Sequence, residues 1–288
     1  MKKIIVMADF SVFSNKALQY AIPLASKMGA EILLCHGVEP EMLTPMPNLL
    51  NWPSEALEKE VNIAQQTLIK YISETQASDY YKTHGSPLIT PITELGGVKQ
   101  ILDNLIKEEK EAIMVVMGLA GKGTLDRFLL GSNSLDVIDD CALPVLLIPK
   151  EANFNPLNKI AFATDLSKSD IQTIHDLARL FCLYMPEILL THVCEGEINP
   201  NMLPTNVSDF LNDITAKINY SKIYYRQIKE DDVLSGIKWI TENGRIDMLA
   251  MIHRNSSIFS RIFKGSNTQK ISSWIQLPLL VMPQVNAN

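Results

Sequence analysis

The feature that most constrains the fold is an internal duplication within the 288 residues. Residues 3–9 resemble residues 159–165, and one residue and then a serine follow each segment. The offset is 156 residues (159 minus 3), and it recurs further along the chain. It relates Leu33, Leu34, His36 and Glu39 to Leu189, Leu190, His192 and Glu195. A constant offset over separate segments indicates two copies of one folding unit.

Towards the end of each copy the offset becomes 134 residues (265 minus 131), where Gly131-Ser132-Asn133 matches Gly265-Ser266-Asn267. The first copy therefore carries 22 extra residues (156 minus 134), between about Glu39 and Gly118. We predict one domain at residues 1–150 and a second at 159–288. Residues 151–158 are polar and contain a proline, which is typical of a linker.

Short apolar runs alternate with segments of helical periodicity in each copy. In the first copy we predict strands at 4–8, 31–38, 88–94, 112–117 and 144–148, and helices at 14–28, 54–76, 98–107 and 132–140. In the second copy we predict strands near 159–164, 187–193, 222–228, 247–252 and 278–282. This alternation predicts an α/β fold in which each copy forms a five-stranded parallel sheet flanked by helices.

Charge and cysteine usage narrow the class of partner. The formal net charge of −6 argues against binding to nucleic acid or to an anionic membrane, because both need a basic surface. The four cysteines have no metal-ligand spacing, so we expect reduced, mostly buried thiols in a cytoplasmic protein. The apolar run after the N-terminal lysines is too short for a signal peptide, and no segment reaches membrane-spanning length.

The most informative segment runs from Met117 to Ser134. Glycines at 118, 121 and 123 follow a predicted buried strand, and Gly131-Ser132-Asn133 opens a predicted helix. Glycine lets a phosphate approach the backbone, and amides at a helix N-terminus attract anions. Open α/β sheets bind ligands at this carboxyl edge. An ordinary strand–loop–helix connection with turn glycines is the alternative reading.

The spacing Gly118, two residues, Gly121, nine residues, Gly131-Ser132 resembles the ATP-binding signature of universal stress proteins. The resemblance extends along the chain, through Ala8-Asp9-x-Ser11, Leu33-Leu34-x-His36, Met117-Gly118 and Pro144-Val145-Leu146. It implies two tandem Rossmann-like domains of the adenine nucleotide α-hydrolase-like type. It also implies that the final strands, Val145–Ile148 and Leu279–Met282, pair about a pseudo-two-fold axis, which would satisfy two sheet edges.

The resemblance also implies a role for each matching residue. Asp9 corresponds to an aspartate near the adenosine, and Gly37 stands where the family usually has a valine whose backbone meets adenine. Met117, Gly118 and Gly121 match the loop around ribose and phosphates. Gly131, Ser132 and Asn133 match the triphosphate-binding turn. Lys122 either screens phosphate charge or is an exposed loop lysine, and any Mg²⁺ would be held mainly by phosphates and water.

The second copy departs from this pattern. Gly265-Ser266 is present, but Ile252 or His253, and Asn255, replace the two leading glycines. We therefore expect a structural partner there, with phosphate attraction aided by Arg254, Arg261 and Lys264 as the alternative. His36 and His192 recur without a second ligand at metal spacing, so we expect structural histidines.

Three functions are compatible with these patterns. The first is an ATP-binding stress-response protein in which the nucleotide is a regulatory ligand of the first domain. The second is a slow ATPase, and the third is a nucleotide-free interaction module. No nucleophile elbow, zinc-protease helix or P-loop motif is present, which favours the first function over the second. A homodimer of the tandem chain is left open.

Overall fold

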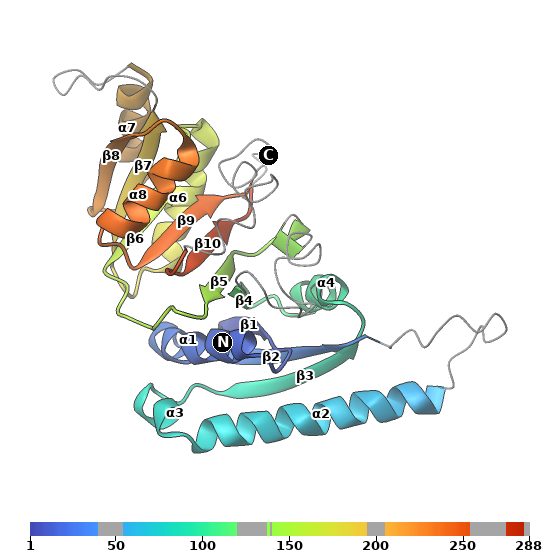
Figure 1. Ribbon diagram of the computed structural model, residues 1–288. Helices are drawn as coiled ribbons and strands as arrows, with labels where there is room; N and C mark the ends of the chain where they lie inside the picture. Colours follow the sequence, from blue (N-terminus) through green and yellow to red (C-terminus); the bar gives the residue numbers. More distant parts are fainter. Residues whose placement is uncertain (40–53, 120–136, 139, 195–204, 254–274, 285–288) are drawn as a thin grey trace. The chain divides into compact units, whose positions relative to one another are not determined.

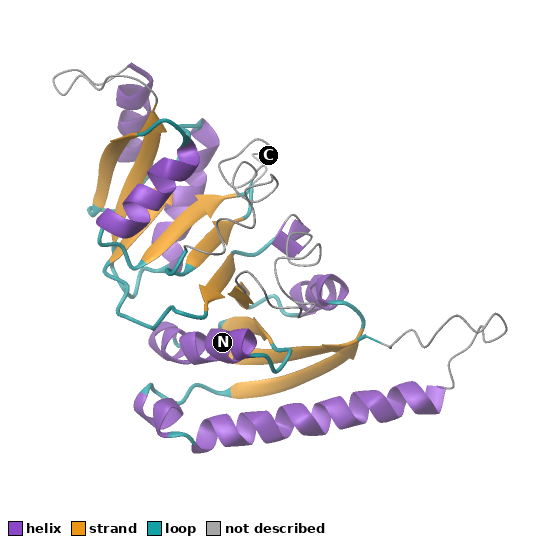
Figure 2. Ribbon diagram, in the orientation of Figure 1, coloured by secondary structure: helices purple, strands orange, loops and turns teal. Residues whose placement is uncertain are grey.

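The computed structural model describes residues 1–39, 54–119, 137–138, 140–194, 205–253 and 275–284 (Figure 1). The chain divides into two compact units, of which Met1–Gly118 belong to the first and the residues from Pro144 onward to the second. In both units, helices flank strands of sheet (Figure 2). The predicted α/β fold class is thereby confirmed.

The first unit alternates strands and helices along the chain. Its elements are β1 (Lys3–Met7), α1 (Val12–Met28), β2 (Glu31–Val38), α2 (Ser54–Ala77), α3 (Asp79–Thr83), β3 (Ile89–Leu95), α4 (Val98–Glu108) and β4 (Ala112–Leu119). The strands lie in the order β3-β2-β1-β4 and all their pairings are parallel. Ile4, Ile5 and Val6 of β1 are fully buried, as expected of a central strand covered on both faces.

Helix α1 shows why the chain folds in this way locally. Its N-cap is Ser11, whose hydroxyl accepts a hydrogen bond from the backbone N–H of Ser14. Its C-cap is Gly29, which adopts the left-handed conformation (φ 63°) that glycine tolerates without steric cost. Pro23 lies inside this helix and is buried, and it has no backbone N–H to donate to the preceding turn.

The second unit repeats this plan. Its elements are β5 (Val145–Pro149), β6 (Lys159–Ala163), α6 (Lys168–Leu180), β7 (Glu187–Cys194), α7 (Thr205–Lys217), β8 (Ile223–Lys229), α8 (Val233–Asn243), β9 (Met248–Ile252) and β10 (Leu279–Met282). The strands lie in the order β5-β10-β9-β6-β7-β8. The pairing of β5 with β10 is antiparallel, and the others are parallel.

Strand registers place the extra residues of the first copy more narrowly than the sequence does. Ile32 pairs with Ile89 in the first unit, and Ile188 pairs with Ile223 at the equivalent position in the second. Ile188 follows Ile32 by 156 residues, whereas Ile223 follows Ile89 by only 134. The offset therefore changes between β2 and β3. The insertion therefore lies between β2 and β3, where α2 has 24 residues against 13 in α7, and where α3 adds five more.

The two final strands pair as predicted. Leu146 of β5 lies opposite Leu280 of β10, and these leucines are equivalent under the offset of 134. The neighbouring pairs, Leu147 with Leu279 and Val145 with Val281, make the register symmetric about this central pair. Because β5 bonds to β10, the compact second unit begins at Pro144, before β5. Residues 151–158 contain no helix or strand, and the repeat boundaries remain a prediction.

Several predicted boundaries are corrected. Strand β4 continues to Leu119 rather than ending at Met117, so Gly118 lies within a strand. Helix α3 is not predicted by the sequence pattern, because five residues are too few to show a period. Of the predicted helix 132–140, only residues 137, 138 and 140 are described, and they are helical.

Two further expectations concern cysteines and membrane spans. All four cysteines are free, but only Cys35 and Cys141 are buried, whereas Cys182 is exposed and Cys194 is intermediate. The expectation of mostly buried thiols is therefore wrong for half of them. Among the described helices, none combines the length and the apolar character required to cross a bilayer.

Candidate functional site

The candidate site lies at the carboxyl edge of β2, β1 and β4, which are neighbours in the first unit. Asp9 follows the end of β1, Gly37 lies near the end of β2, and Gly118 lies near the end of β4. The parallel sheet brings these three predicted residues to one edge, although they are far apart in sequence. The other predicted residues, Gly121, Lys122, Gly131, Ser132 and Asn133, lie outside the described residues, and Met117 is a buried residue of β4.

The turn after β1 is held by Asp9. One carboxylate oxygen of Asp9 (Oδ1) accepts a hydrogen bond of 2.9 Å from the backbone N–H of Ser11. Phe10, between them, has a positive φ of 62°, which is uncommon for a residue with a side chain. Asp9 is half-buried, and this hydrogen bond holds its carboxylate in the turn at the sheet edge.

His36 connects β2 to the same turn. Its Nδ1 lies 2.7 Å from the carbonyl oxygen of Ala8, so Nδ1 carries the proton and donates. The ring of Phe10 packs on His36 with a centroid separation of 4.6 Å. Tyr71 of α2 then contacts Phe10 edge-to-face at 5.7 Å. This arrangement gives His36 a structural role, in agreement with the sequence-based expectation.

Tyr71 links three elements around this corner. Its hydroxyl donates a hydrogen bond of 3.0 Å to the side-chain oxygen of Asn15 in α1. Burial, and after it the negative charge of Asp9, raises the pKa of Tyr71 to about 12. Sequence reasoning missed Tyr71, because nothing in the pattern of a long amphipathic helix marks the residue that faces the β1 turn.

The same corner is built again in the second copy. His192 Nδ1 lies 3.1 Å from the carbonyl oxygen of Thr164, and Leu166 has a φ of 63°. Asp165 accepts a hydrogen bond from the N–H of Ser167, as Asp9 does from Ser11. Because these contacts recur where the first copy carries a glycine motif and the second does not, they belong to the fold itself.

The second corner also carries a buried polar pair that the first lacks. The Thr164 hydroxyl donates a 2.6 Å hydrogen bond to the carboxylate of Asp170, which is fully buried. The same hydroxyl oxygen accepts a bond of 2.9 Å from the N–H of Leu166. The first copy has Ala8 and Ser14 at the equivalent positions. The turn of the second copy is therefore stabilised by the Thr164 and Asp170 side chains, in addition to the contacts that both copies share.

Gly37 has a packing reason to lack a side chain. A Cβ built on Gly37 would lie 2.7 Å from Cδ1 of Ile101 in α4 and 2.9 Å from the carbonyl oxygen of Gly96. The N–H of Ala8 donates to the carbonyl oxygen of Cys35, so alternation along β2 also turns the backbone groups of Gly37 toward β1. They point beyond the last paired residues of these strands, Met7 and Cys35.

In the second copy the large residue is on the strand and the glycine is on the helix, the reverse of the first copy. Val193 stands at the position of Gly37, and Gly236 of α8 faces it. A Cβ on Gly236 would lie 2.4 Å from Cγ2 of Val193. In one copy the helix supplies the bulk, through Ile101, and in the other the strand supplies it, through Val193. The departure at Gly37 from the family's usual valine is therefore matched by a compensating residue.

Gly118 also has a packing role. A Cβ on Gly118 would lie 2.5 Å from the carbonyl carbon and 2.6 Å from the carbonyl oxygen of Phe13. The absence of a side chain allows the first turn of α1 to approach the end of β4. The second copy has Ile252, which is buried, at this position and the smaller Ser169 at the position of Phe13.

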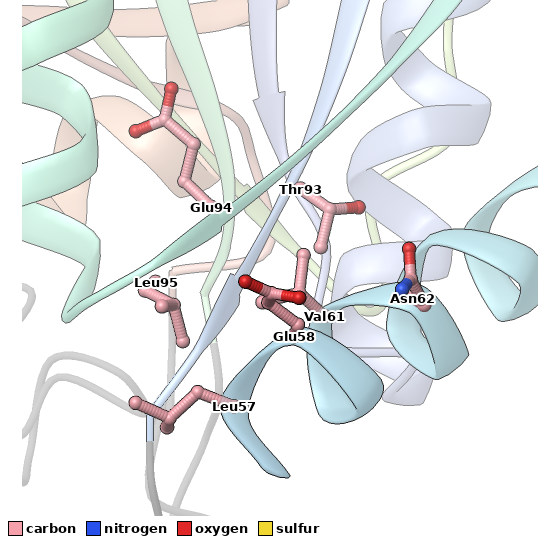
Figure 3. A pocket seen from close by; sticks show the side chains of 7 residues that line it. All are labelled: Leu57, Glu58, Val61, Asn62, Thr93, Glu94 and Leu95. Atoms are coloured by element: carbon pink, nitrogen blue, oxygen red, sulfur yellow. The ribbon is translucent and has the colours of Figure 1, made fainter. Parts of the chain in front are cut away.

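A pocket of about 700 Å³ lies next to this edge, between α2 and the end of β3 (Figure 3). Its lining residues are Leu57, Glu58, Val61, Asn62, Thr93, Glu94 and Leu95. In Figure 3 the carboxylate of Glu94 points away from that of Glu58. Burial and the nearby charge of Glu108 raise the pKa of Glu94. Carboxylates and apolar side chains suit a phosphate poorly, so this pocket does not replace the glycine motif as a phosphate site.

Comparison with known proteins agrees with this geometry. The family model described as "Universal stress protein family" matches residues 1–149. A universal stress protein of Methanocaldococcus jannaschii is 30% identical over 151 residues, which cover 52% of this chain and 82% of that protein. Another, from Mycolicibacterium smegmatis, is 29% identical over 150 residues and is covered over 47% of its own length.

The whole chain also resembles a solved structure. The crystal structure of a universal stress protein from Archaeoglobus fulgidus superposes with a TM-score of 0.67 and 17% identity, covering 98% of both chains. At this identity the likeness concerns the fold. Together with the match of the family model over the first copy, these findings show that the chain belongs to the universal stress protein family.

Proposed function

We propose that the first copy binds ATP, and that the nucleotide is a regulatory ligand in a stress-response role. One observation carries the proposal: Asp9, Gly37 and Gly118 reach the same carboxyl edge of three adjacent parallel strands, from which the glycine motif continues. Ligands bind at this edge in open α/β sheets. The class of ligand, ATP, is supported by the family to which the chain belongs and by the spacing Gly118, Gly121, Gly131-Ser132.

The residues present fit such a ligand. Gly37 turns its backbone donor and acceptor toward the space beyond β1, which suits the edge of a base. Asp9 presents a half-buried carboxylate beside it, which suits ribose hydroxyls. The glycine-rich segment would bind the phosphates, and any Mg²⁺ would be held through these phosphates.

The second copy is proposed as a structural partner without nucleotide. The second copy has Ile252, a buried residue, where the first copy has Gly118, and therefore lacks the glycine with which the motif begins. The buried Thr164–Asp170 pair fastens the adjoining turn internally. We propose a cytoplasmic location for the protein, which its free cysteines favour.

Nucleotide content tests the proposal. Freshly purified protein would be denatured and its supernatant separated by ion-pair chromatography, in parallel with Gly131→Glu. We expect about one ATP per chain, lost in Gly131→Glu, because an added carboxylate repels phosphate. Two ATP per chain would overturn the assignment of the second copy. No nucleotide, even after soaking with Mg-ATP, would overturn the proposal and leave an interaction module.

Turnover distinguishes a regulatory ligand from a substrate. Phosphate release would be measured with the wild type and Gly131→Glu under the same conditions. We expect equal, background rates in both, because the motifs of the chain supply no activated nucleophile or base. Release that is faster in the wild type and lost in the variant would make the protein an ATPase.

A further inference from the structure

The two units differ at their outer strands. β3 ends the order of strands in the first unit, and β8 ends it in the second. An edge strand exposes unpaired backbone N–H and C=O groups, which can pair with another chain unless the edge is blocked or covered. The duplication allows the two edges to be compared residue by residue, because β8 follows β3 with the offset of 134.

The direction of the edge groups follows from printed hydrogen bonds. The N–H of Ile32 donates to the carbonyl oxygen of Leu88, and that of Ile188 donates to Lys222 at the equivalent position. Backbone groups alternate along a strand, so those of Pro91 in β3 and Tyr225 in β8 point outward. The same holds in β8 for Ile223 and Gln227, one on each side of Tyr225.

The first edge is blocked at its centre. Pro91 has no N–H to donate, and proline in a sheet is found where this donor would face away from the ladder. Helix α2 also packs along β3 (Figure 1). In the second unit Tyr225 replaces this proline and supplies the missing donor, while α6 is the main packing partner of the shorter α7 among the described elements.

Side chains at the second edge are of a kind that favours protein contacts. Tyr224 is 49% exposed, and Arg226 on the same face of β8 lies over the ring of Trp239 at 4.8 Å from its centroid. Tyrosine, arginine and tryptophan are the residues most enriched at the energetic centres of interfaces. The stacking on Trp239 holds the Arg226 charge beside α8. Among the described residues, none bonds to the outward backbone groups of Tyr225.

We propose that β8 pairs antiparallel with β8 of a second copy of this chain, centred on Tyr225. In this register the two Tyr225 residues exchange both of their backbone hydrogen bonds, and Ile223 does so with Gln227 of the other chain. Tyr224 lies opposite Arg226, which places an aromatic ring beside a cation, and no two like charges oppose each other. Centring on Arg226 instead would oppose two cations, and it would pair residues whose backbone groups already face β7.

The oligomeric state of the full chain tests this inference, which does not depend on nucleotide binding. Sedimentation velocity would compare the wild type with Tyr225→Pro, which gives the second edge the residue that blocks the first. We expect a dimer for the wild type and a monomer for Tyr225→Pro, with unchanged circular dichroism. A monomeric wild type at high micromolar concentration would overturn the proposal, as would a dimer that persists in the folded variant.

A cysteine pair gives a second measurement that needs no proline. Tyr225→Cys places a thiol opposite itself across the pairing, where the Cα separation of about 5.5 Å suits a disulfide. We expect a disulfide-linked dimer on mild oxidation of Tyr225→Cys, above the background of the exposed native Cys182 in the wild type. Arg226→Cys is the matched control, because residue 226 opposes residue 224. Equal cross-linking of both variants would overturn the register.

Discussion

A Cβ on Gly37 would lie 2.7 Å from Cδ1 of Ile101, closer than two carbon atoms approach without strain. The second copy has the bulky residue on the strand, as Val193, and the glycine on the helix, as Gly236. This exchange of sizes couples residues that are distant in sequence. The pair predicts how substitutions at the two positions combine.

Gly37→Val should lower the free energy of unfolding by about 1–3 kcal/mol, the usual cost of overpacking a filled site. Ile101→Ala should also destabilise, by about 2–5 kcal/mol, because it removes a buried side chain. The double variant should lose less than the sum, by about 0.5–3 kcal/mol, since each change relieves the other. Rescue stays partial because the carbonyl oxygen of Gly96 lies 2.9 Å from the same Cβ.

Urea unfolding of the four proteins in this cycle measures the coupling. Gly236→Ile with Val193→Gly is the matched cycle in the second copy, and it should show coupling of the same sign. Strict additivity in both cycles would contradict the packing relationship.

Gly118→Ala should destabilise by about 1–3 kcal/mol, because the added Cβ meets the backbone of Phe13. Truncating the partner should not restore stability here, since the closest atoms belong to the main chain. Unfolding of Gly118→Ala and of Gly118→Ala with Phe13→Ala provides the test. Val12→Ala, at a site that is 74% exposed, is the control, and we expect a change within about 0.5 kcal/mol. Full rescue by Phe13→Ala would contradict the prediction.

His36→Ala should cost more stability than His192→Ala. Both substitutions remove the hydrogen bond to a main-chain carbonyl, which costs about 1–3 kcal/mol when the acceptor is left buried. His36 alone also packs on an aromatic ring, that of Phe10, and such pairs add about 0.5–1.5 kcal/mol. Chemical denaturation of the two variants gives the comparison, and Phe10→Leu should remove the difference. A larger loss for His192→Ala would be inconsistent with this account.

The raised pKa of Tyr71 predicts that the protein loses stability at alkaline pH. This pKa is raised from 10.0 to about 12, first by burial and then by the charge of Asp9, so the folded state holds the phenolic proton more tightly. The unfolded state releases this proton first, and the contribution is therefore complete below pH 10 and declines as the pH rises through 12. Tyr71→Phe should flatten the fall in stability over this range, as measured by urea unfolding at a series of pH values. Tyr224→Phe is the control at an exposed tyrosine, and an equally steep fall in Tyr71→Phe would refute the prediction.

The sequence predicted the plan of the fold because this plan depends on patterns that are local or repeated. Apolar runs such as those ending before Asp9 and Asp165 mark buried strands, and the constant offset relates the two copies. The antiparallel partnership of the two final strands was predicted from a resemblance to a family. The registers of β5 and β10 confirm it, with equivalent leucines opposite each other.

Helix ends and short elements were less well predicted. α1 begins at Val12 rather than Ser14, and β4 runs two residues past Met117. These ends are decided by caps and by pairing with neighbouring strands, which a window of apolar residues does not contain. The insertion in the first copy was bounded only loosely, until the pairing of Ile32 with Ile89 assigned it to the connection between β2 and β3.

The sequence by itself determined the duplication and the alternation of strands and helices, because these follow from periodicity and spacing along one chain. Only the tertiary structure decided that Gly37 and Gly118 make room for Ile101 and Phe13. It also decided that the backbone groups of Pro91 and Tyr225 point away from the neighbouring strand of their sheets. These facts depend on which residues meet across the core and on the direction of each backbone group. Close packing fixes such relationships between residues far apart in the chain, and no local pattern encodes them.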